Sequence, residues 1–305
     1  MAKANAKVLI TGGSGLVGTR LTEILLSSGY EVAHLSTSKR RASRPDGVVV
    51  HGWNPAEGSI DADALKGVNC IVNLAGASIS KRWTTAYKKE IRSSRVDTLR
   101  TLFKALEKSD HSVSSLISSS AVGYYPSRVG EEFVETDAPG NDFLGSVSQE
   151  WEEQANRFES LGVRVAIMRT GIVLSIKGGA LPVMAKFVRL FLGAPLGSGK
   201  QIFPWIHIDD LSLMYQHALE KELSGPFNAV GPKGATNKEF NKELGRIMNR
   251  PIWPLNVPSF VLYMILGKQA QLVLISSPSS SKKIEQSGFR FKFDTLNKAL
   301  KDSLK

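Results

Sequence analysis

The sequence predicts an α/β protein: a Rossmann-like, doubly wound parallel sheet with a smaller C-terminal substrate region. Three observations support this prediction. A glycine-rich turn joins an apolar strand to a helix near the N-terminus, strand and helix patterns alternate up to about residue 169, and shorter elements follow. The chain has 305 residues, of which 42% are hydrophobic and 22% charged, so it can bury a large core.

The first element is the run from Lys7 to Gly18. Residues 8–10 are continuously apolar, as in a strand covered on both faces, and glycines follow in the spacing G-x-x-G-x-x-G. The first glycine allows a tight turn, the second lets the backbone approach a pyrophosphate, and the third lets the helix lie close to the strand. A helix over about residues 16–28 would offer its N–H groups to the phosphates. We therefore expect cofactor contacts from Gly12, Ser14, Gly15, Leu16, Val17 and Gly18.

A tight strand-to-helix turn without a ligand is the alternative. A second strand at residues 31–36, at the distance of a βαβ unit, favours the nucleotide site. Further strands are expected at 48–51, 70–74, 115–119 and 163–168, with helices at about 84–108 and 147–160. Such alternation predicts a parallel sheet with helices on both faces. After Arg169 glycine and proline become frequent, and the serine-rich run 276–281 is expected to be a flexible loop.

The charge balance is strongly basic. Lys and Arg number 39 and Asp and Glu 28, which gives a net charge of +11. The basic residues are spread along the chain without interleaved aromatic residues, so no nucleic-acid partner is expected. The apolar stretch 260–275 is interrupted by Lys268 and too short to cross a bilayer; no membrane partner is expected, and the stretch is interpreted as core or interface.

The Cys, His and N-terminal residues predict neither a disulfide, nor a metal site, nor a signal peptide. The single Cys70 lies in an apolar stretch and cannot form an internal disulfide, and the spacing of the five His residues predicts no metal site. Residues 1–7 lack the apolar core of a signal peptide, so the expected location is cytoplasmic.

The end of the second strand indicates which nucleotide binds. NAD-binding strands usually end in Asp or Glu, whereas this one ends in Ser36 and Thr37, followed by Lys39, Arg40 and Arg41. Hydroxyls and cationic side chains can hold a 2′-phosphate through charge-assisted hydrogen bonds. The predicted cofactor is NADP(H); the alternative is a solvated basic loop.

The motifs together resemble a known family over nearly the whole chain. Residues 11–18, 73–76, 118–121 and 204–210 are similar to the extended short-chain dehydrogenase/reductases. More narrowly, Arg82-Trp83, residues 91–95, Phe143-Leu144 and Gly288-Phe289 resemble its atypical epimerase family, whose members are labelled nucleoside-diphosphate-sugar epimerase-like or cell-division-inhibitor-like.

The resemblance implies further cofactor residues and a domain division. It places Leu74, Ala75 and Gly76 under the cofactor, and Glu90 and Arg95 near it; an ion pair on the helix surface is the alternative for these two. It also implies an NADP-binding domain over residues 1–250, with substrate-region elements from about 170, and a short C-terminal domain of uncharacterised role over 251–305.

The resemblance also implies a catalytic serine without its usual partners. Extended members use a Ser, a Tyr that transfers the proton, and a Lys four residues later. Ser120 matches the serine, but Leu144 and Ser148 stand where the Tyr and Lys are expected, and neither can replace them. Tyr124 or the adjacent Tyr125 could supply a phenol, although neighbouring aromatic residues are more often packing residues.

Other polar residues have structural interpretations. His207 with Asp209 and Asp210 resembles an acid–base pair, yet an aspartate at this position is expected to cap the helix that follows. Arg169 could meet an anionic substrate or the loop backbone. The acidic residues between 131 and 137 are expected to be solvated.

Two functions remain from the sequence. The first is an NADP(H)-dependent oxidoreductase or epimerase-like enzyme that acts on a carbonyl or hydroxyl group of a small-molecule substrate, with a nucleotide sugar as one candidate. The second is a non-catalytic NADPH-binding sensor or regulatory protein. The missing Tyr and Lys favour the second, whereas Ser120 and the loop-rich C-terminal half favour the first. The sequence does not predict an oligomeric state.

Overall fold

A computed structural model describes residues 6–38 and 47–305. Lys39, Arg40 and Arg41, which carry part of the NADP prediction, lie outside the described residues. The central sheet has eight strands in the order β11-β7-β6-β5-β1-β2-β3-β4. Neighbouring strands are parallel except β3 and β4. Their bounds are β1 Lys7–Thr11, β2 Glu31–Ser36, β3 Val49–Asn54, β4 Ser59–Ile60, β5 Val68–Asn73, β6 Ser115–Ala121, β7 Arg164–Thr170 and β11 Gly225–Ala229.

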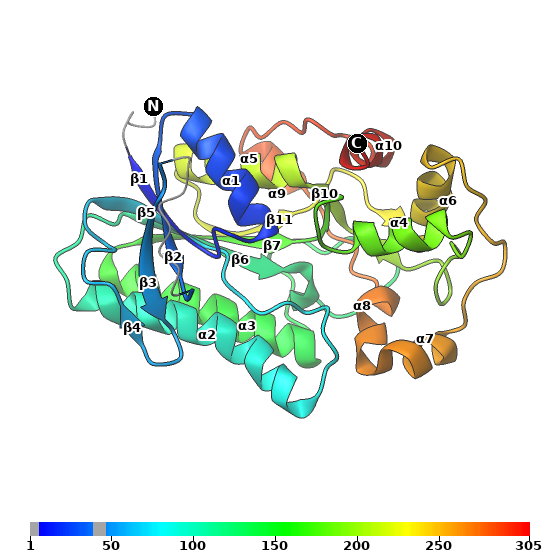
Figure 1. Ribbon diagram of the computed structural model, residues 1–305, viewed down its shortest axis with the longest axis horizontal. Coiled ribbons are helices and arrows are strands. Elements are labelled where there is room, and N and C mark those ends of the chain that lie inside the picture. The colour runs from blue at the N-terminus through cyan, green and yellow to red at the C-terminus, as the bar shows by residue number, and fades with distance from the viewer. Residues whose placement is uncertain (1–5, 39–46) are drawn as a thin grey trace.

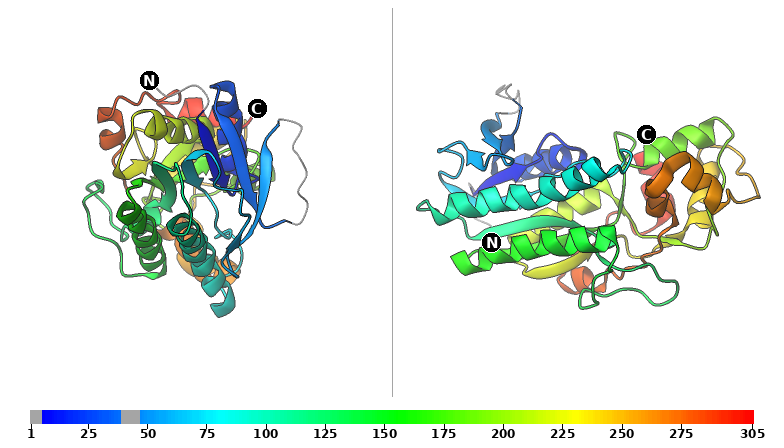
Figure 2. Two further views of the ribbon diagram at one scale, coloured as in Figure 1. Left: turned by 90° about the vertical axis from the view of Figure 1, so that its left-hand side faces the viewer. Right: turned by 90° about the horizontal axis from the view of Figure 1, so that it is seen from below.

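Helices cover both faces of this sheet (Figures 1 and 2). One face packs against α1 (Leu16–Ser27) and α5 (Ile208–Glu220), and the other against α2 (Thr85–Glu107) and α3 (Phe143–Asn156). The alternation of side chains within strands explains this division, since Val8 and Ile10 join the first core cluster while Leu9 joins the second. The predicted doubly wound sheet is confirmed.

The C-terminal half forms a smaller layer beside the carboxyl ends of the strands (Figure 1). Two short sheets, β8 with β10 and β9 with β12, join helices around a third core cluster that includes Trp205 and Phe240. The bounds are β8 Ile172–Leu174, α4 Leu181–Arg189, β9 Ile202–Phe203, β10 Trp205–His207, β12 Ala235–Thr236, α6 Asn237–Ile247, α7 Ser259–Leu266, α8 Gln271–Leu274, α9 Lys282–Gln286 and α10 Leu296–Ser303.

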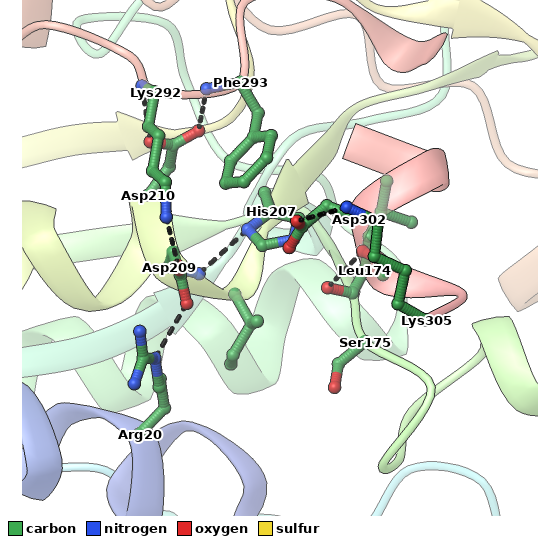
Figure 3. A network of polar contacts seen from close by, with 12 residues as sticks. Arg20, Leu174, Ser175, His207, Asp209, Asp210, Lys292, Phe293, Asp302 and Lys305 are labelled. Atoms are coloured by element: carbon green, nitrogen blue, oxygen red, sulfur yellow. Dashed lines mark hydrogen bonds and ion pairs between the residues drawn. The ribbon is translucent and has the colours of Figure 1, made fainter. Parts of the chain in front are cut away.

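Polar contacts attach the end of the chain to the start of α5 (Figure 3). The Asp210 carboxylate accepts hydrogen bonds from the backbone N–H groups of Lys292 (2.8 Å) and Phe293 (3.0 Å). Asp209 accepts from Arg20 Nε at 2.7 Å and from Lys292 Nζ at 2.9 Å. These two carboxylates therefore join α1, α5 and the C-terminal segment.

The helix cap at this site differs from the predicted one. The N-cap of α5 is His207, whose Nδ1 accepts from Asp209 N at 3.1 Å, and the two aspartates lie in the first turn. The aspartates still favour the helix, because negative charge in the first turn interacts well with the helix dipole.

Other differences from the predictions have clear physical causes. The strand β11, which pairs with β7, was not predicted, because Gly225 and Pro226 at its start indicate a turn. The serine-rich run is not a flexible loop. Ser276 and Ser279 are buried, and residues 278–280 exchange backbone hydrogen bonds with Phe133. Composition suggested flexibility, but pairing with a segment distant in the sequence orders this run.

Candidate cofactor and catalytic site

The glycine-rich turn has the geometry that its spacing predicts. Gly12 has φ = +67°, a conformation that favours glycine. A Cβ on Gly18 would lie 2.4 Å from Gly12 O, so only glycine permits the helix to approach the turn. A Cβ on Gly15 would meet only Gly12 O, at 3.2 Å. The turn is thus tightly packed at Gly12 and Gly18 and leaves open space beside Gly15.

The start of α1 is suited to an anion. Its N-cap is Gly15, no side chain caps it, and its first turn, which includes Leu16 and Val17, contains no acidic residue. N–H groups in the first turn of a helix have no partner within the helix, and the helix dipole adds positive potential there. A pyrophosphate fits this position.

A pocket of about 400 Å³ continues from the turn along the carboxyl ends of the strands. It brings together Gly12 and Ser14 with Ser36 and Thr37 from the end of β2. It also includes Ala75 and Gly76 after β5, residues 53–56 at the end of β3 and just beyond it, and part of α2 around Ser94 and Asp97. Ligands of open α/β sheets bind at this edge, where the order of strands reverses.

A buried polar network fixes the strand ends behind this pocket. Thr11 Oγ1 donates to Asn73 Oδ1 at 2.7 Å and accepts from the N–H groups of Leu74 and Ala75, each at 3.1 Å. Asn73 Nδ2 also donates to Ser118 Oγ at 3.3 Å. The network holds residues 74–76 against the glycine turn, where Gly12 approaches Leu74 closely.

Arg95 is a neighbour of Gly76, which lines the pocket, whereas Glu90 is exposed on α2. Arg95 Nη1 donates to the carbonyls of Ile91 (2.8 Å) and Ala77 (3.3 Å). A Cβ on Gly76 would lie 3.2 Å from Arg95 Cζ, which makes the two residues neighbours. Burial lowers the pKa of Arg95 to about 10. The guanidinium is therefore held by carbonyls beside the pocket, where a cofactor anion would favour its charge.

Ser120 lies at the carboxyl end of β6 and is buried. Its hydroxyl donates to Glu152 Oε1 from α3 at 2.6 Å. Arg169 of β7 binds the same carboxylate through two hydrogen bonds, Nε to Oε1 at 2.9 Å and Nη2 to Oε2 at 2.8 Å. The carboxylate directs the Ser120 proton toward α3 and leaves the serine lone pairs for another donor.

Arg169 also organises the two tyrosines. Its Nη1 donates to Tyr125 Oη at 2.9 Å, and Tyr125 donates in turn to Asn228 at 2.7 Å. Burial raises the pKa of Tyr125 to about 12. Tyr124 is half-buried with its ring 3.6 Å from Arg169 Cζ; burial raises its pKa too, although Arg169 partly opposes this. Both phenols are thus weaker acids than an ordinary tyrosine.

Apolar packing occupies the place of the expected Tyr. Leu144 packs against the buried cluster of Trp83, Ile91 and Val147, as do Phe143 and Leu272 of α8. Ser148 is buried on α3 one turn before Glu152. The buried ionisable residue of this helix is therefore Glu152, one turn after Ser148.

Sequence reasoning missed Glu152 and predicted only part of the role of Arg169. Arg169 lies inside β7, which runs to Thr170, and its Nη1 donates to the loop carbonyl of Glu135 at 3.0 Å, as one of the two alternatives predicted. Its pair with Glu152 was not predicted. Two signals were available in the sequence: Arg169 stands at the end of an apolar strand, and Glu152 follows Trp151. Charged residues in such apolar surroundings are nearly always paired when they are buried, so a partner for each could have been sought. Glu135 was also more than a solvated acid, since its carboxylate accepts from Asn228 N at 2.8 Å.

The fold and this pocket define a nicotinamide dinucleotide-binding protein of the extended short-chain dehydrogenase/reductase type. The chain belongs to the NAD dependent epimerase/dehydratase family, which it matches over residues 8–231. Residues 257–303 match a domain of unknown function, DUF1731. The resemblance stated from the motifs is confirmed, and so is a nicotinamide dinucleotide as the cofactor class.

Several relatives cover the chain from end to end. It is 37% identical to epimerase family protein Mb2239 of Mycobacterium bovis over 97% of each chain. It is 35% identical to epimerase family protein YfhF of Bacillus subtilis, over 96% of each chain. A relative from Arabidopsis thaliana, 36% identical over 96% of this chain and 85% of its own length, is described as chloroplastic.

Solved structures agree with the fold. Human epimerase family protein SDR39U1, solved with NADPH, has a TM-score of 0.87 and 33% identity, covering 97% of this chain and 98% of its own. Thermus thermophilus UDP-glucose 4-epimerase, solved with NAD, has a TM-score of 0.75 at 20% identity, covering 97% and 98%. The second likeness concerns the fold alone.

Proposed function

We propose that this chain is an NADP(H)-dependent oxidoreductase or epimerase-like enzyme that acts on a hydroxyl or carbonyl of a small metabolite. The observation that carries the proposal is the buried Ser120–Glu152–Arg169 arrangement at the carboxyl end of β6. A bound nicotinamide supplies hydride transfer. The chain's own residues would then orient the oxygen of the reacting carbon.

Three parts of the pocket would hold the cofactor. The start of α1 and the open Gly15 fit the pyrophosphate, and Ala75 and Gly76 line the pocket after β5, the strand that pairs with the Ser120 strand β6. Ser36 and Thr37 line the pocket at the end of β2, in place of the Asp or Glu that would repel a 2′-phosphate. These features, and the NADPH bound by the human relative, support NADP(H) over NAD(H).

Ser120 is the proposed catalytic residue, and Glu152 is a positioning residue. Because the serine proton points to Glu152, Ser120 Oγ is set to accept a hydrogen bond from a substrate hydroxyl. Tyr124 remains the candidate phenol, since Tyr125 is committed to Arg169 and Asn228. The substrate itself, a nucleotide sugar included, stays open, and the cytoplasmic location stays a prediction.

The test is cofactor oxidation or reduction by purified, cofactor-loaded protein on addition of a metabolite library. With a responsive substrate, single-turnover rates of Ser120→Ala should fall about 10²–10³-fold, as for loss of one oriented hydrogen-bonding group. Tyr124→Phe tests the phenol, with Tyr125→Phe as its matched neighbour. An unchanged rate in Ser120→Ala would refute the assignment.

A second function has its own support. Leu144 and Ser148 cannot transfer or tune a proton, and the raised pKa of Tyr124 makes it a poor replacement. A non-catalytic NADPH-binding sensor would retain the pocket without turnover. Tight NADPH binding with no turnover of any metabolite would make this the better account.

A further inference from the structure

Several exposed apolar side chains lie on α4, the loop after it and α7. These helices are at the end of the molecule farthest from β1–β4 (Figure 1). We call these side chains together the apolar end face, defined by Phe187, Leu190 and Leu192, on and just after α4, with Phe260, Met264 and Ile265 of α7. Met264 and Ile265 are 73% and 74% exposed. Apolar side chains gathered in this way on a folded protein mark an interaction site.

Hydrogen bonds and a bridge join the two segments that carry these side chains. Trp253, which precedes α7, donates its Nε1 proton to Phe191 O at 2.7 Å, and its backbone N–H donates to Gly193 O at 2.8 Å. Leu196 and Val257 form a bridge between the same two segments. The loop after α4 and the approach to α7 are therefore held side by side.

The charges around this face are mainly positive. The sequence contains no Asp or Glu from residue 160 to 208, and none from 244 to 284. Lys186 and Arg189 are exposed on α4, the Arg250 guanidinium lies over the Phe191 ring, and Lys268 follows α7. Of the carboxylates on α6, Glu243 pairs with Arg246, whereas Glu239 accepts hydrogen bonds from Thr236 and keeps its charge. The face thus combines large apolar side chains with an excess of positive charge.

This combination selects the occupant. A second copy of the same face would bring positive charges together, which disfavours self-association. Apolar side chains beside Lys and Arg are typical of segments that lie in the interface of a bilayer with anionic lipids. No helix in the described part of the chain is long and apolar enough to cross a membrane. The eight residues of α7 span only about 12 Å, so the helix would lie on the surface.

We propose that the apolar end face docks on the surface of an anionic phospholipid bilayer. The Lys and Arg side chains of the two segments that lack Asp and Glu are attracted to the anionic lipids. Phe260, Met264 and Ile265 enter the headgroup region. This changes the expectation from the sequence, in which the net charge was spread and no membrane partner was predicted. The fold gathers two distant acid-free segments onto one face.

The test is co-sedimentation of the NADPH-loaded protein with vesicles. Phosphatidylcholine vesicles containing about one-third phosphatidylglycerol should bind the protein, pure phosphatidylcholine should bind it weakly, and added salt should reduce binding. Met264→Asp should weaken binding about tenfold or more. Val49→Asp, an exposed apolar position on β3, is the matched control and should have no effect.

A second pair of variants separates the face from the overall charge. Lys186→Glu with Arg189→Glu should weaken vesicle binding, whereas Lys89→Glu with Lys104→Glu on α2, which makes the same change in net charge, should weaken it much less. Retained NADPH affinity shows that each variant is folded. Failure to bind anionic vesicles, equal losses in both pairs, or a dimer that Met264→Asp converts to a monomer would each overturn the proposal.

Discussion

A buried ion pair determines how Ser120 can act. Glu152 and Arg169 are almost fully buried, at 7% and 3% exposure, and each satisfies the other's charge while Glu152 holds the serine hydroxyl. Burial opposes the charge on Arg169, yet its hydrogen bonds to Glu152 raise the pKa of the guanidinium above its ordinary value. Removal of either partner leaves an uncompensated buried charge.

Glu152→Ala should therefore lower the free energy of unfolding by about 3–5 kcal/mol. Urea denaturation measures the change, and Glu153→Ala, an exposed neighbour on the same helix, is the control. A change below about 0.5 kcal/mol, the range of ordinary surface substitutions, would contradict the structural role of the pair.

Gly15→Val should abolish dinucleotide binding while the protein stays folded. A Cβ at Gly15 meets only one backbone atom, so the added side chain points mainly into the space that a pyrophosphate would occupy. Circular dichroism checks the fold and fluorescence titration with NADPH checks binding; Gly15→Ala should show a smaller loss. Retained affinity in the valine variant would place the phosphates elsewhere.

Residues with a local task were predictable from the sequence. The spacing of Gly12, Gly15 and Gly18 indicates what each does: one allows the tight turn, one leaves room for a pyrophosphate, and one lets the helix pack closely. The requirement for glycine at position 13 was not predictable, because it comes from the ring of His34: a Cβ on Gly13 would lie 2.5 Å from that ring. Glu152 and Arg169 come from different elements, and only the packed sheet brings them together.

At the scale of elements, the start of α5 joins three parts of the chain through His207, Asp209 and Asp210. His207 Nε2 lies 3.4 Å from Asp302 of α10, and its ring centroid is 3.7 Å from that of Phe293 (Figure 3). Burial lowers the pKa of His207 below its ordinary value, although Asp209 and Asp302 oppose the shift.

This lowered pKa predicts a pH dependence of stability. Between the folded pKa and about 6.5 the unfolded state binds more protons, so stability is fully present above about pH 6.5 and falls as the pH drops below it. His207→Asn keeps a capping side chain and removes the titration. The free energy of unfolding should decline less between pH 7 and about 5.5 in this variant. An identical slope would assign the dependence to other groups, such as His217, whose pKa burial also lowers.

Asp210→Ala should release the C-terminal segment. The carboxylate accepts from two backbone N–H groups at residues 292 and 293, and its removal leaves them without these partners. Limited proteolysis should cut near this segment faster than in the wild type. Asp294→Ala, which removes only a surface pair with Lys298, should leave the rate unchanged, and equal rates in both variants would contradict the attachment.

Elements with strong apolar patterns were predicted well, as in β1, β5 and α2. Weak patterns failed where distant contacts decide the structure. The strand β11 is only five residues long and begins with Gly-Pro, and the serine-rich run is ordered by Phe133 and Asn228.

At the scale of the whole molecule, the parallel sheet brings separate strand ends to one edge. Residues at the ends of β1, β2 and β5 line the pocket, while Ser120 lies on β6 and Arg169 on β7. The alternation of elements predicted this edge, and the glycine-rich turn predicted its cofactor class. The chemistry was not predictable, because it depends on what replaces the usual Tyr and Lys; the domain division at residue 250 also stays a prediction.

The measurement that tests the central claim most directly is a calorimetric comparison of NADPH and NADH binding to the purified protein. The account predicts tighter binding of NADPH, because β2 ends at the pocket in Ser36 and Thr37 in place of Asp or Glu, and Lys39 and Arg40 follow in the sequence. Lys39→Glu with Arg40→Glu should remove most of the preference by placing like charge near the 2′-phosphate. Equal or tighter binding of NADH by the wild type would contradict the claim.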